Sequence, residues 1–568
     1  MTTRGSVKSS LPKRFDAVVV GSGFGASAVA CRLAQAGRAV LVLERGRSYP
    51  PGSFPRSPRG LAGNLWDPSS GLYGLFDVWA FSRIEALVSS GLGGGSLIYA
   101  NVLLRKDPAW FVDDAPGHPP RPWPISYTDL EPHYEAAETM LGAQRYPFGL
   151  APYSETAKTR ATRDAASALG LEWQLPPLAV SFASPGQGAA PGQPLVEEHP
   201  NLHGLPRRTC RLCGECDIGC NDGAKNTLDY TYLSRATDAG AEIRTMCEVR
   251  RIEPLPSGGY RIGYVRHDPD GPPGAAPSAE VTADRLVIGA GTFGSTYLLL
   301  RNRAALPALG RALGTRFSGN GDLLTFLRRS RRDVAGVEVP RPLDPEYGPV
   351  ITSAIRLPDT LDGHGSVGRG FYVEDGGNPQ FLDWIVQTAD MPSASGRVVE
   401  FALRRLWSHL VGRPRSNISG DVSRLLGGGV ASSTLLPMLT MGRDVPDGVM
   451  RLRDGDLDLD RRTQSSASYY DRVEATLGEI ARVLGAKLAN TPLWLFKRAI
   501  TVHPLGGVPM GDGPDRGVVD QWGEVFSYPG LHVVDGSVMP GPVGPNPSLT
   551  IAAFAERAAA HIVGQGAS

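Results

Sequence analysis

The stretch Phe15-Asp16-Ala17-Val18-Val19-Val20-Gly21-Ser22-Gly23-Phe24-Gly25-Ala26 decides the fold of this chain. An apolar run enters a glycine turn, and a helical pattern leaves the turn over residues 27–36. A second apolar run, residues 39–43, ends at Glu44. A strand, a Gly-x-Gly-x-x-Gly/Ala turn, a helix, a second strand and a terminal acid together form the fingerprint of a dinucleotide-binding βαβ unit.

Each residue type in this fingerprint has a physical reason. Gly21 permits the tight turn, Gly23 lets the backbone approach a pyrophosphate, and Ala26 lets the helix pack closely on the strand. The helix N-terminus offers free N–H groups and a partial positive charge to the phosphates. Glu44 is placed to accept hydrogen bonds from ribose hydroxyls, whereas a merely structural glycine turn would leave this acid unexplained.

The bulk composition excludes several classes of protein. With 568 residues the chain can bury a large core and is expected to hold two to four domains. Its 58 basic and 57 acidic residues balance, so nothing indicates a nucleic-acid partner. Residues 1–14 are polar, no apolar run is long enough to span a membrane, and four of the six cysteines are clustered. We therefore expect a soluble cytoplasmic protein.

Two further segments are rich in glycine. Residues 89–102 carry Gly93, Gly94, Gly95 and Ser96 ahead of an apolar run, which predicts a backbone that lies flat against a ligand; a flexible linker is the alternative. Residues 285–300 read as a second strand, glycine turn and helix, with Gly289 and Gly291 in the turn. One sheet is therefore expected to be assembled from distant parts of the chain.

The remaining elements are predicted from periodicity. Residues 124–142 form an amphipathic helix with Thr128 and Glu131 as a capping box, and residues 470–484 form another. Strands are predicted within 350–357, 370–374 and 448–452, and a helix over 381–389. The helix over 398–411 has an apolar face flanked by arginines, which suits either peripheral contact with a membrane or packing over the core or a substrate cavity.

The C-terminal motifs carry a family resemblance. Residues 502–507 (Val-His-Pro-Leu-Gly-Gly), 531–537 (Leu-His-Val-Val-Asp-Gly-Ser) and 540–551, taken with the glycine turns above, resemble the glucose–methanol–choline oxidoreductases. The segment 316–322 (Arg-Phe-Ser-Gly-Asn-Gly-Asp) is most similar to their cholesterol-oxidase-like branch. The nucleotide-binding segments match throughout, but residues 330–500 match only loosely.

The resemblance implies FAD rather than NAD as the cofactor. It implies an α/β fold: an FAD-binding, Rossmann-like three-layer domain built from discontinuous segments, plus a substrate domain with an antiparallel sheet and covering helices. The FAD-binding parts are expected at 1–110, 206–330 and 500–568, with a connecting helix and surface excursion at 111–205 and the substrate domain at 331–499. The residues it places on FAD are Gly21, Gly23, Ala26, Glu44, Val249 (near adenine), Gly93, Gly94, Gly95, Ser96, Asn101, Gly289, Gly291, Asp535, Gly536, Pro547 and Ser548.

The predicted chemistry is oxidation of an alcohol by hydride transfer to flavin N5. His503 is the expected base for the hydroxyl proton, because imidazole titrates near neutral pH. Asn546 can bind the same oxygen, since an amide both donates and accepts hydrogen bonds. His and Asn occupy these two motif positions in the branch that the chain resembles. Glu374 could be a second acid or base, but an ordinary solvated glutamate is favoured.

The cysteines Cys210, Cys213, Cys216 and Cys220 follow the spacing C-x2-C-x2-C-x3-C of bacterial ferredoxins. This spacing favours an iron–sulfur cluster, either 3Fe-4S or 4Fe-4S, with Cys220 or Cys247 as a fourth ligand. Some sugar dehydrogenases of the family that the chain resembles carry such a cluster. Zinc and metal-free thiols are the alternatives.

Three functions therefore follow from the sequence. The first is an FAD-dependent oxidoreductase acting on a small apolar alcohol, with a sterol or steroid 3-hydroxyl favoured and O2 as acceptor. The second is an iron–sulfur-assisted dehydrogenase of a sugar, terpenoid or long-chain alcohol that passes electrons to a quinone or cytochrome. The third is a flavin-binding electron carrier without turnover.

Overall fold

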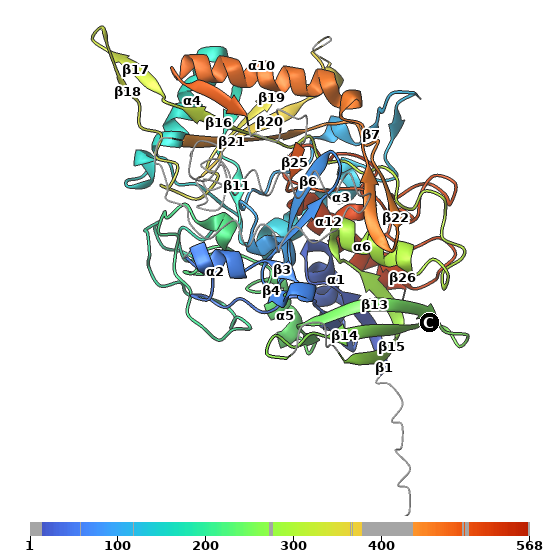
Figure 1. The fold of residues 1–568 in the computed structure, drawn as a ribbon. Coiled ribbons are helices and arrows are strands. Elements are labelled where there is room, and N and C mark those ends of the chain that lie inside the picture. The colour runs from blue at the N-terminus through green and yellow to red at the C-terminus, as the bar shows by residue number, and fades with distance from the viewer. Residues whose placement is uncertain are drawn as a thin grey trace, which may run out of the picture.

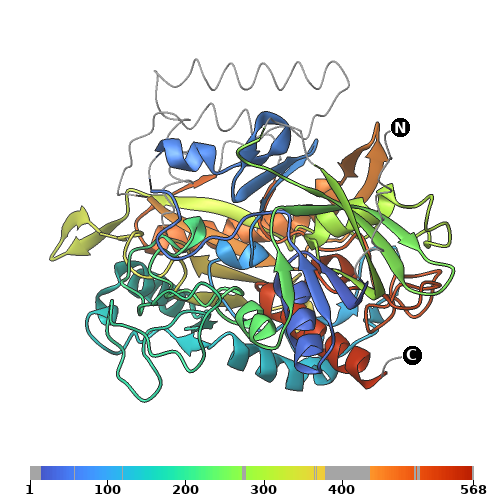
Figure 2. The same ribbon diagram turned by 90° about the horizontal axis from the view of Figure 1, so that it is seen from below.

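The computed structural model describes residues 14–565 except 57, 118, 272–276, 364, 366, 378–434, 491–493 and 495–498. Two large sheets dominate this part of the chain and lie toward opposite ends of the molecule (Figures 1 and 2). The helices predicted over 381–389 and 398–411 fall outside the described residues. None of the described helices combines the length and apolar character that a membrane crossing requires.

The nucleotide sheet has seven strands. Its parallel core runs β12, β2, β1, β15 and β26, and β14 and β13 extend it in antiparallel fashion from β15. Its strands come from three distant parts of the chain, as the sequence predicts. They are β1 (Arg14–Val20), β2 (Val40–Leu43), β12 (Glu242–Arg244), β13 (Cys247–Pro254), β14 (Tyr260–Arg266), β15 (Ser278–Ile288) and β26 (Leu531–Val533).

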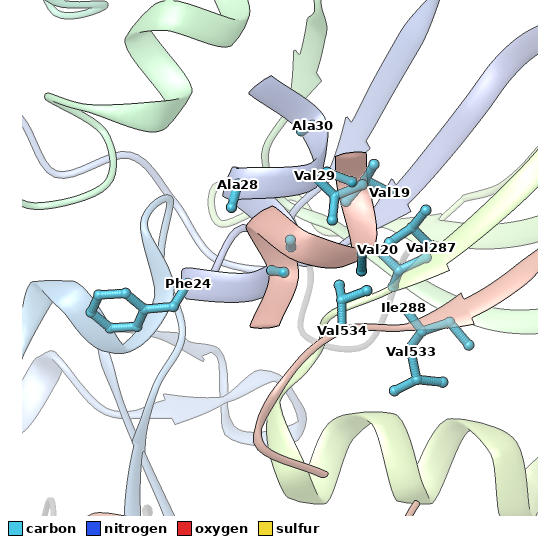
Figure 3. Packing of buried hydrophobic residues seen from close by; sticks show 14 of the residues in the cluster. Val19, Val20, Phe24, Ala28, Val29, Ala30, Val287, Ile288, Val533 and Val534 are labelled. Carbon is cyan, nitrogen blue, oxygen red and sulfur yellow. The ribbon is translucent and has the colours of Figure 1, made fainter. Parts of the chain in front are cut away.

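Continuous apolar runs form the centre of this sheet because parallel strands are buried on both faces. Val18, Val19, Val287 and Ile288 are fully or almost fully buried. Helix α1 (Phe24–Gln35) packs against α12 (Ser548–Gly564) and α5 (Tyr232–Asp238), and α12 packs against α3 (Tyr127–Met140). Figure 3 shows the valines of β1, β15 and β26 gathered beside α1, while Phe24 points away from them.

The substrate sheet has six strands, all antiparallel, in the order β10-β19-β20-β21-β16-β24. Helices α4 (Ala157–Leu169) and α10 (Ala467–Val483) pack against each other, and α4 also contacts β19 and β20. Its strands are β10 (Glu172–Gln174), β16 (Leu323–Arg328), β19 (Ala354–Leu357), β20 (Phe371–Asp375), β21 (Leu435–Gly442) and β24 (Lys487–Asn490). The division of the chain into five segments stays a prediction, but α4 and β10, from segment 111–205, lie with this sheet.

Smaller elements connect the two large sheets. In a three-stranded sheet, β25 (Ala499–Thr501) runs parallel to β6 (Ile84–Ser89), which pairs with β5 (Phe76–Ala80). The other helices are α2 (Pro58–Gly63) and α6 (Gly291–Arg301). Two-stranded pairs are formed by β3 (Trp66–Asp67) with β4 (Leu72–Tyr73), β7 (Val112–Asp113) with β8 (Arg121–Pro122), β9 (Gln144–Arg145) with β11 (Pro177–Leu178), β17 (Arg331–Val334) with β18 (Val337–Pro340), and β22 (Val449–Arg453) with β23 (Asp456–Asp460).

Helix α3 has a capping box, but the predicted residues Thr128 and Glu131 are wrong. The helix begins at Tyr127, so Ser126 is the N-cap residue. The Ser126 hydroxyl accepts from the Asp129 N–H at 3.2 Å, and the Ser126 N–H donates to the Asp129 carboxylate at 2.8 Å. Aspartate can close this box in place of the expected glutamate because both side chains reach the N-cap N–H.

Candidate active site

Two glycine turns meet at the end of the nucleotide sheet. Gly21 has φ +91°, and a Cβ there would lie 2.4 Å from the Gly289 carbonyl oxygen. A Cβ at Gly289 would in turn lie 2.7 Å from the Ala26 Cβ. The predicted cofactor residues Gly21, Ala26 and Gly289 therefore pack as one unit, which requires the small side chains that the fingerprint supplies.

Gly25 is a required glycine that sequence reasoning missed. A Cβ at this position would stand 1.7 Å from the carbonyl oxygen of Val534, so no side chain fits. The contact lets α1 lie directly against the segment that follows β26 (Figure 3). The signal was present as the third glycine of the turn, but the spacing rule assigned close packing to Ala26 alone.

Hydrogen bonds through Glu44 and Ser22 link the loop that begins at Gly93 to the Gly21–Ala26 turn. The Ser22 hydroxyl donates to its carboxylate at 2.6 Å, and the Gly46 N–H donates at 2.8 Å. The same Ser22 hydroxyl accepts from the Gly93 N–H at 3.0 Å. Burial of Glu44 raises the pKa of its carboxyl, and these hydrogen bonds oppose that shift.

The loop after Gly93 lies against the dinucleotide turn. A Cβ at Gly94 would stand 2.7 Å from the Gly23 Cα, and the Ser96 hydroxyl donates to the Gly93 carbonyl at 2.7 Å. Gly95, in contrast, has nothing within 4 Å of a Cβ. Across the sheet, β13 brings Val249 near Glu44, whose carbonyl accepts from the Cys247 N–H at 2.8 Å.

The buried side chain of Asn101 indicates whether a flavin fits beside this loop. It is fully buried, it has φ 71°, and neither its amide oxygen nor its amide nitrogen has a hydrogen-bond partner among the described residues. A buried amide without partners costs free energy unless a ligand supplies them. Its position at the end of the Gly93 loop suits the hydrogen-bonding edge of a flavin ring, so the residues present fit FAD.

Asp535 holds the C-terminal segment to the glycine turn at Gly289 and Gly291. Its buried carboxylate accepts from the Gly291 N–H at 2.8 Å and from the Ser537 N–H at 2.9 Å. Burial raises the pKa of the Asp535 carboxyl. The carbonyl of Gly536 accepts from the Gly506 N–H at 3.0 Å, which brings the His503 segment alongside.

His503 follows β25 and is oriented by a buried aspartate. Its Nδ1 lies 2.8 Å from the Asp322 carboxylate oxygen Oδ1. Oδ2 of Asp322 accepts from the Thr501 hydroxyl at 2.9 Å, from the Val502 N–H at 2.9 Å and from the His503 N–H at 3.2 Å. The Asp322 side chain is 1% exposed and that of His503 is 15% exposed. With Nδ1 engaged, Nε2 is the nitrogen that can face a substrate.

Asp322 ends the segment 316–322, which is hydrogen-bonded to the segments that carry His503 and Asn546. The Asn320 amide donates to the carbonyls of Gly544 and Pro545 and accepts from the Gly544 N–H at 2.8 Å. Backbone hydrogen bonds join Ser318 and Leu505 in both directions. Sequence reasoning used this segment only as a family motif and missed that Asp322 contacts His503.

Asn546 lies against Glu374, which overturns the expectation of a solvated glutamate. Glu374 on β20 is fully buried, and its Oε2 accepts from the Asn546 amide at 3.3 Å. Burial raises the pKa of Glu374 to about 8, and the nearby charges of Asp375 and Asp322 add to that rise. Glu374 Oε1 and Asn546 Oδ1 have no hydrogen-bond partner among the described residues.

Pro547 and Ser548 follow Asn546 directly. Pro547 is the N-cap residue of α12, and Ser548 is the first residue of that helix. Their loop is fixed by the buried Lys106, which donates to the Pro542 and Val543 carbonyls at 2.9 and 3.0 Å. Because the buried Lys106 side chain donates to two consecutive backbone carbonyls, it holds this turn in place ahead of Asn546 and the start of α12.

The four clustered cysteines line one cavity together with Lys225. Lys225 donates to the Cys216 carbonyl at 2.9 Å and lies 4.8 Å from the Tyr99 ring centroid, so the cavity adjoins the Gly93–Asn101 loop. Yet no three histidine, cysteine or acidic groups of the described residues are arranged to hold a metal ion. We therefore derive no reaction step through a metal at these cysteines.

The fold and the glycine turns define the class of protein: an α/β protein with a dinucleotide-binding βαβ unit. Comparison with known proteins then identifies the family. Family models described as GMC oxidoreductase match residues 205–316 and 449–555, and a model described as NAD(P)-binding Rossmann-like domain matches residues 19–52. The chain belongs to the GMC oxidoreductase family, in its cholesterol-oxidase-like branch.

Two relatives support this placement, and a solved structure shows the fold. The chain is 31% identical to a cholesterol oxidase of Mycobacterium tuberculosis, over 96% of this chain and 90% of that protein. It is 28% identical to a cholesterol oxidase of Acinetobacter baumannii, over 96% and 94%. The crystal structure of a pyridoxine 4-oxidase from Mesorbium loti covers 96% of this chain and 98% of its own, with a TM-score of 0.58 and 19% identity, and so shows the same fold. The chain is therefore an enzyme, and the alternative of a flavin carrier without turnover is wrong.

Proposed function

We propose that this enzyme oxidises the 3-hydroxyl of a sterol or a related apolar steroid, with His503 as the base. The observation that carries the proposal is the 2.8 Å contact between His503 Nδ1 and Asp322. The contact favours a proton on Nδ1, so that Nε2 carries the lone pair that accepts the hydroxyl proton. Two relatives with the name cholesterol oxidase support the sterol as substrate.

Asn546 is proposed to bind the substrate oxygen. Its amide nitrogen carries two N–H groups, and the one that does not donate to Glu374 can donate to the substrate oxygen, which leaves the single hydroxyl proton for His503. Its amide nitrogen is held by Glu374 at 3.3 Å, which fixes the direction of the side chain. The alcohol oxygen would thus lie between imidazole and carboxamide before its proton moves.

FAD, when bound, supplies the acceptor for the hydride that leaves the alcohol carbon. The residues that would hold it are those of the two glycine turns, Glu44, the Gly93–Asn101 loop and Asp535. The start of α12, at Ser548, would direct its N–H groups toward the flavin. The relatives' names indicate O2 as the electron acceptor.

Glu374 extends the proposal to a second proton transfer. Fully buried, with a pKa raised to about 8, its carboxyl is held largely protonated at neutral pH. Once deprotonated, it could take a proton from a substrate carbon and return it to another, which would move a double bond in an oxidised steroid. Its free Oε1 is available for that role.

Anaerobic reduction of the enzyme tests the substrate. The flavin absorbance should bleach on addition of cholesterol and stay unchanged with a hexose or a straight-chain primary alcohol. Admission of air should then restore the absorbance and release H2O2. Bleaching by the sugar or the primary alcohol instead would overturn the sterol assignment and leave the FAD-dependent oxidation of alcohols intact.

The iron–sulfur cluster stays a prediction of the cysteine spacing. Its support is that all four cysteines line one cavity next to the Gly93–Asn101 loop. Iron and acid-labile sulfide analysis of anaerobically purified enzyme tests it. Iron and sulfide in amounts matching the flavin would support the dehydrogenase alternative, and their absence would remove it.

A further inference from the structure

Two buried ion pairs begin at consecutive residues just after β21. Arg443 Nε lies 2.7 Å from Asp359 Oδ2, and Arg461 Nη2 lies 2.5 Å from Asp444 Oδ2. None of the four side chains is more than 3% exposed. Because removing both charges from water costs about as much as their attraction returns, a buried ion pair is a weak source of stability. Its role is better sought in the backbone that it holds in place.

Asp444 binds the segment that leads to Asp322. Its Oδ1 accepts from the Ser318 hydroxyl at 2.5 Å, and its Oδ2 accepts from the Gly319 N–H at 3.2 Å. The same Ser318 hydroxyl oxygen accepts from the Asn320 N–H at 2.9 Å. Burial raises the pKa of the Asp444 carboxyl, and the charge of Arg461 and the Ser318 hydrogen bond oppose that shift. One carboxylate thus fixes the backbone of residues 318–320.

Arg461 completes this contact from the side of the substrate sheet. A Cβ at Gly319 would lie 3.0 Å from Arg461 Nη1, so the guanidinium lies close to the glycine backbone. Arg461 Nη2 also donates to the Tyr470 hydroxyl at 3.3 Å, on helix α10, which lies with the strands of the substrate sheet (Figure 1). The Arg461 side chain is therefore held by two groups and placed against residue 319.

Gly319 connects the ion pair to the proposed base. Its carbonyl accepts from the Asp322 N–H at 3.1 Å, which closes the turn that ends at Asp322. Asp322 in turn contacts His503 Nδ1 at 2.8 Å. A shift of Gly319 would therefore move the carboxylate away from the imidazole.

The Arg443–Asp359 pair has the same burial but different partners. Asp359 accepts from the Gly370 N–H at 2.5 Å, and Arg443 donates to Asp114 at 2.7 Å. Among the described residues, neither side chain is hydrogen-bonded to segment 316–322. The two pairs therefore allow the effect of a buried charge to be separated from the effect of holding this segment.

We propose that the Arg461–Asp444 ion pair is a positioning element of the active site, which fixes residues 318–322 so that Asp322 keeps its contact with His503. Neither Arg461 nor Asp444 contacts the reacting atoms. The inference rests on the proposed function for its effect on turnover, but its effect on geometry is independent of any substrate.

Arg461→Met removes the charge and keeps the length of the side chain. In the crystal structure of the flavin-bound variant, His503 Nδ1 and Asp322 Oδ1 should lie beyond about 3.5 Å, where no hydrogen bond remains. The kcat for cholesterol should fall about tenfold with little change in KM, because a small displacement of a group that orients the base slows the chemical step. Arg461→Lys keeps the charge and should restore the contact and most of kcat.

Two further variants complete the experiment. Ser318→Ala removes a single donor to Asp444, so it tests the same link with a smaller risk to folding, and kcat should fall about fivefold. Arg443→Met is the matched control at the equally buried pair. It should lower the thermal midpoint but keep both the Asp322–His503 contact and the wild-type kcat.

The structures and the kinetics separate the possible failures. An unchanged Asp322–His503 contact in both Arg461→Met and Ser318→Ala would overturn the positioning role, as would equal loss of the contact in Arg443→Met. If Arg461→Met does not fold, Ser318→Ala and Arg461→Lys decide. A lost contact with wild-type kcat would support the positioning but overturn the role of Asp322 in the proposed function. Failure of the wild-type enzyme to oxidise cholesterol would leave the comparison of crystal structures valid.

Discussion

Two buried carboxyl groups, Asp322 beside His503 and Glu374 beside Asn546, differ in the hydrogen bonds that they accept. Asp322 receives three donors on Oδ2 and contacts His503 through Oδ1, and no comparable set surrounds Glu374 among the described residues. Glu374 has one donor, Asn546, at 3.3 Å, and its pKa rises to about 8. For Glu374, the single hydrogen bond from Asn546 does not offset the rise in pKa that burial causes.

This difference explains how one pocket can hold a base and an acid at neutral pH. The charge of Asp322 stabilises a proton on His503, because that contact lies away from water. The same charge raises the pKa of Glu374. A carboxyl group whose pKa is raised in this way is typical of sites that carry out a proton transfer near neutral pH.

The largest effect should follow from removal of the imidazole that Asp322 holds. We expect His503→Ala to keep its flavin and to lower turnover by about 10²- to 10⁴-fold, because the hydroxyl proton loses its acceptor. Flavin absorbance and steady-state turnover measure the two quantities. His561→Ala, at a histidine on α12, is the matched control. Wild-type turnover in His503→Ala would remove the proposed base.

Asp322→Asn should have the next largest effect. The side chain keeps its shape but loses the charge that stabilises the protonated imidazole, so we expect kcat to fall about 10- to 100-fold with flavin content unchanged. The substrate KM should change little, because Asp322 does not contact substrate in the proposal. A rise in KM at constant kcat would show that Asp322 serves binding and would break the contrast with Glu374.

Glu374→Gln tests the raised pKa of Glu374 through the pH dependence of the free energy of unfolding. The pKa of Glu374 is raised from 4.5 to about 8, so between these values the folded state holds a proton that the unfolded state has released. The free energy of unfolding then falls as pH rises, by about 1.4 kcal/mol per pH unit at most, until the folded carboxyl ionises. The glutamine variant lacks this contribution.

Denaturant unfolding of flavin-saturated enzyme at pH 6 and pH 7 measures the slope. Between pH 6 and pH 7 the free energy of unfolding should fall more in wild type than in Glu374→Gln. Above pH 9 the free energies of unfolding of the two proteins should change with pH in the same way. Parallel pH dependence in the two proteins would mean that Glu374 is ionised like a solvated carboxyl.

The comparison also shows what could be predicted from the sequence. The strand, glycine turn, helix and second strand that carry Gly21, Gly23 and Glu44 were predictable because they depend on local sequence. The Asp322–His503 contact joins residues 181 positions apart, and the Glu374–Asn546 contact joins residues 172 apart. Glu374 is buried because β20 pairs it with Ala354 and Leu439 in mid-sheet, a register that no local pattern near Glu374 specifies.

The smallest effect concerns a single donor to Asp322. Thr501→Val keeps the shape of the side chain but removes the hydroxyl that donates to Oδ2 at 2.9 Å. One hydrogen bond to a charged group contributes about 1.5 kcal/mol or more, but two backbone N–H donors remain, so we expect kcat to fall by only about fivefold. Thr325→Val, at a buried threonine on β16, is the matched control and should leave kcat unchanged. Wild-type kcat in Thr501→Val would show that the hydroxyl does not help to hold Asp322 against His503.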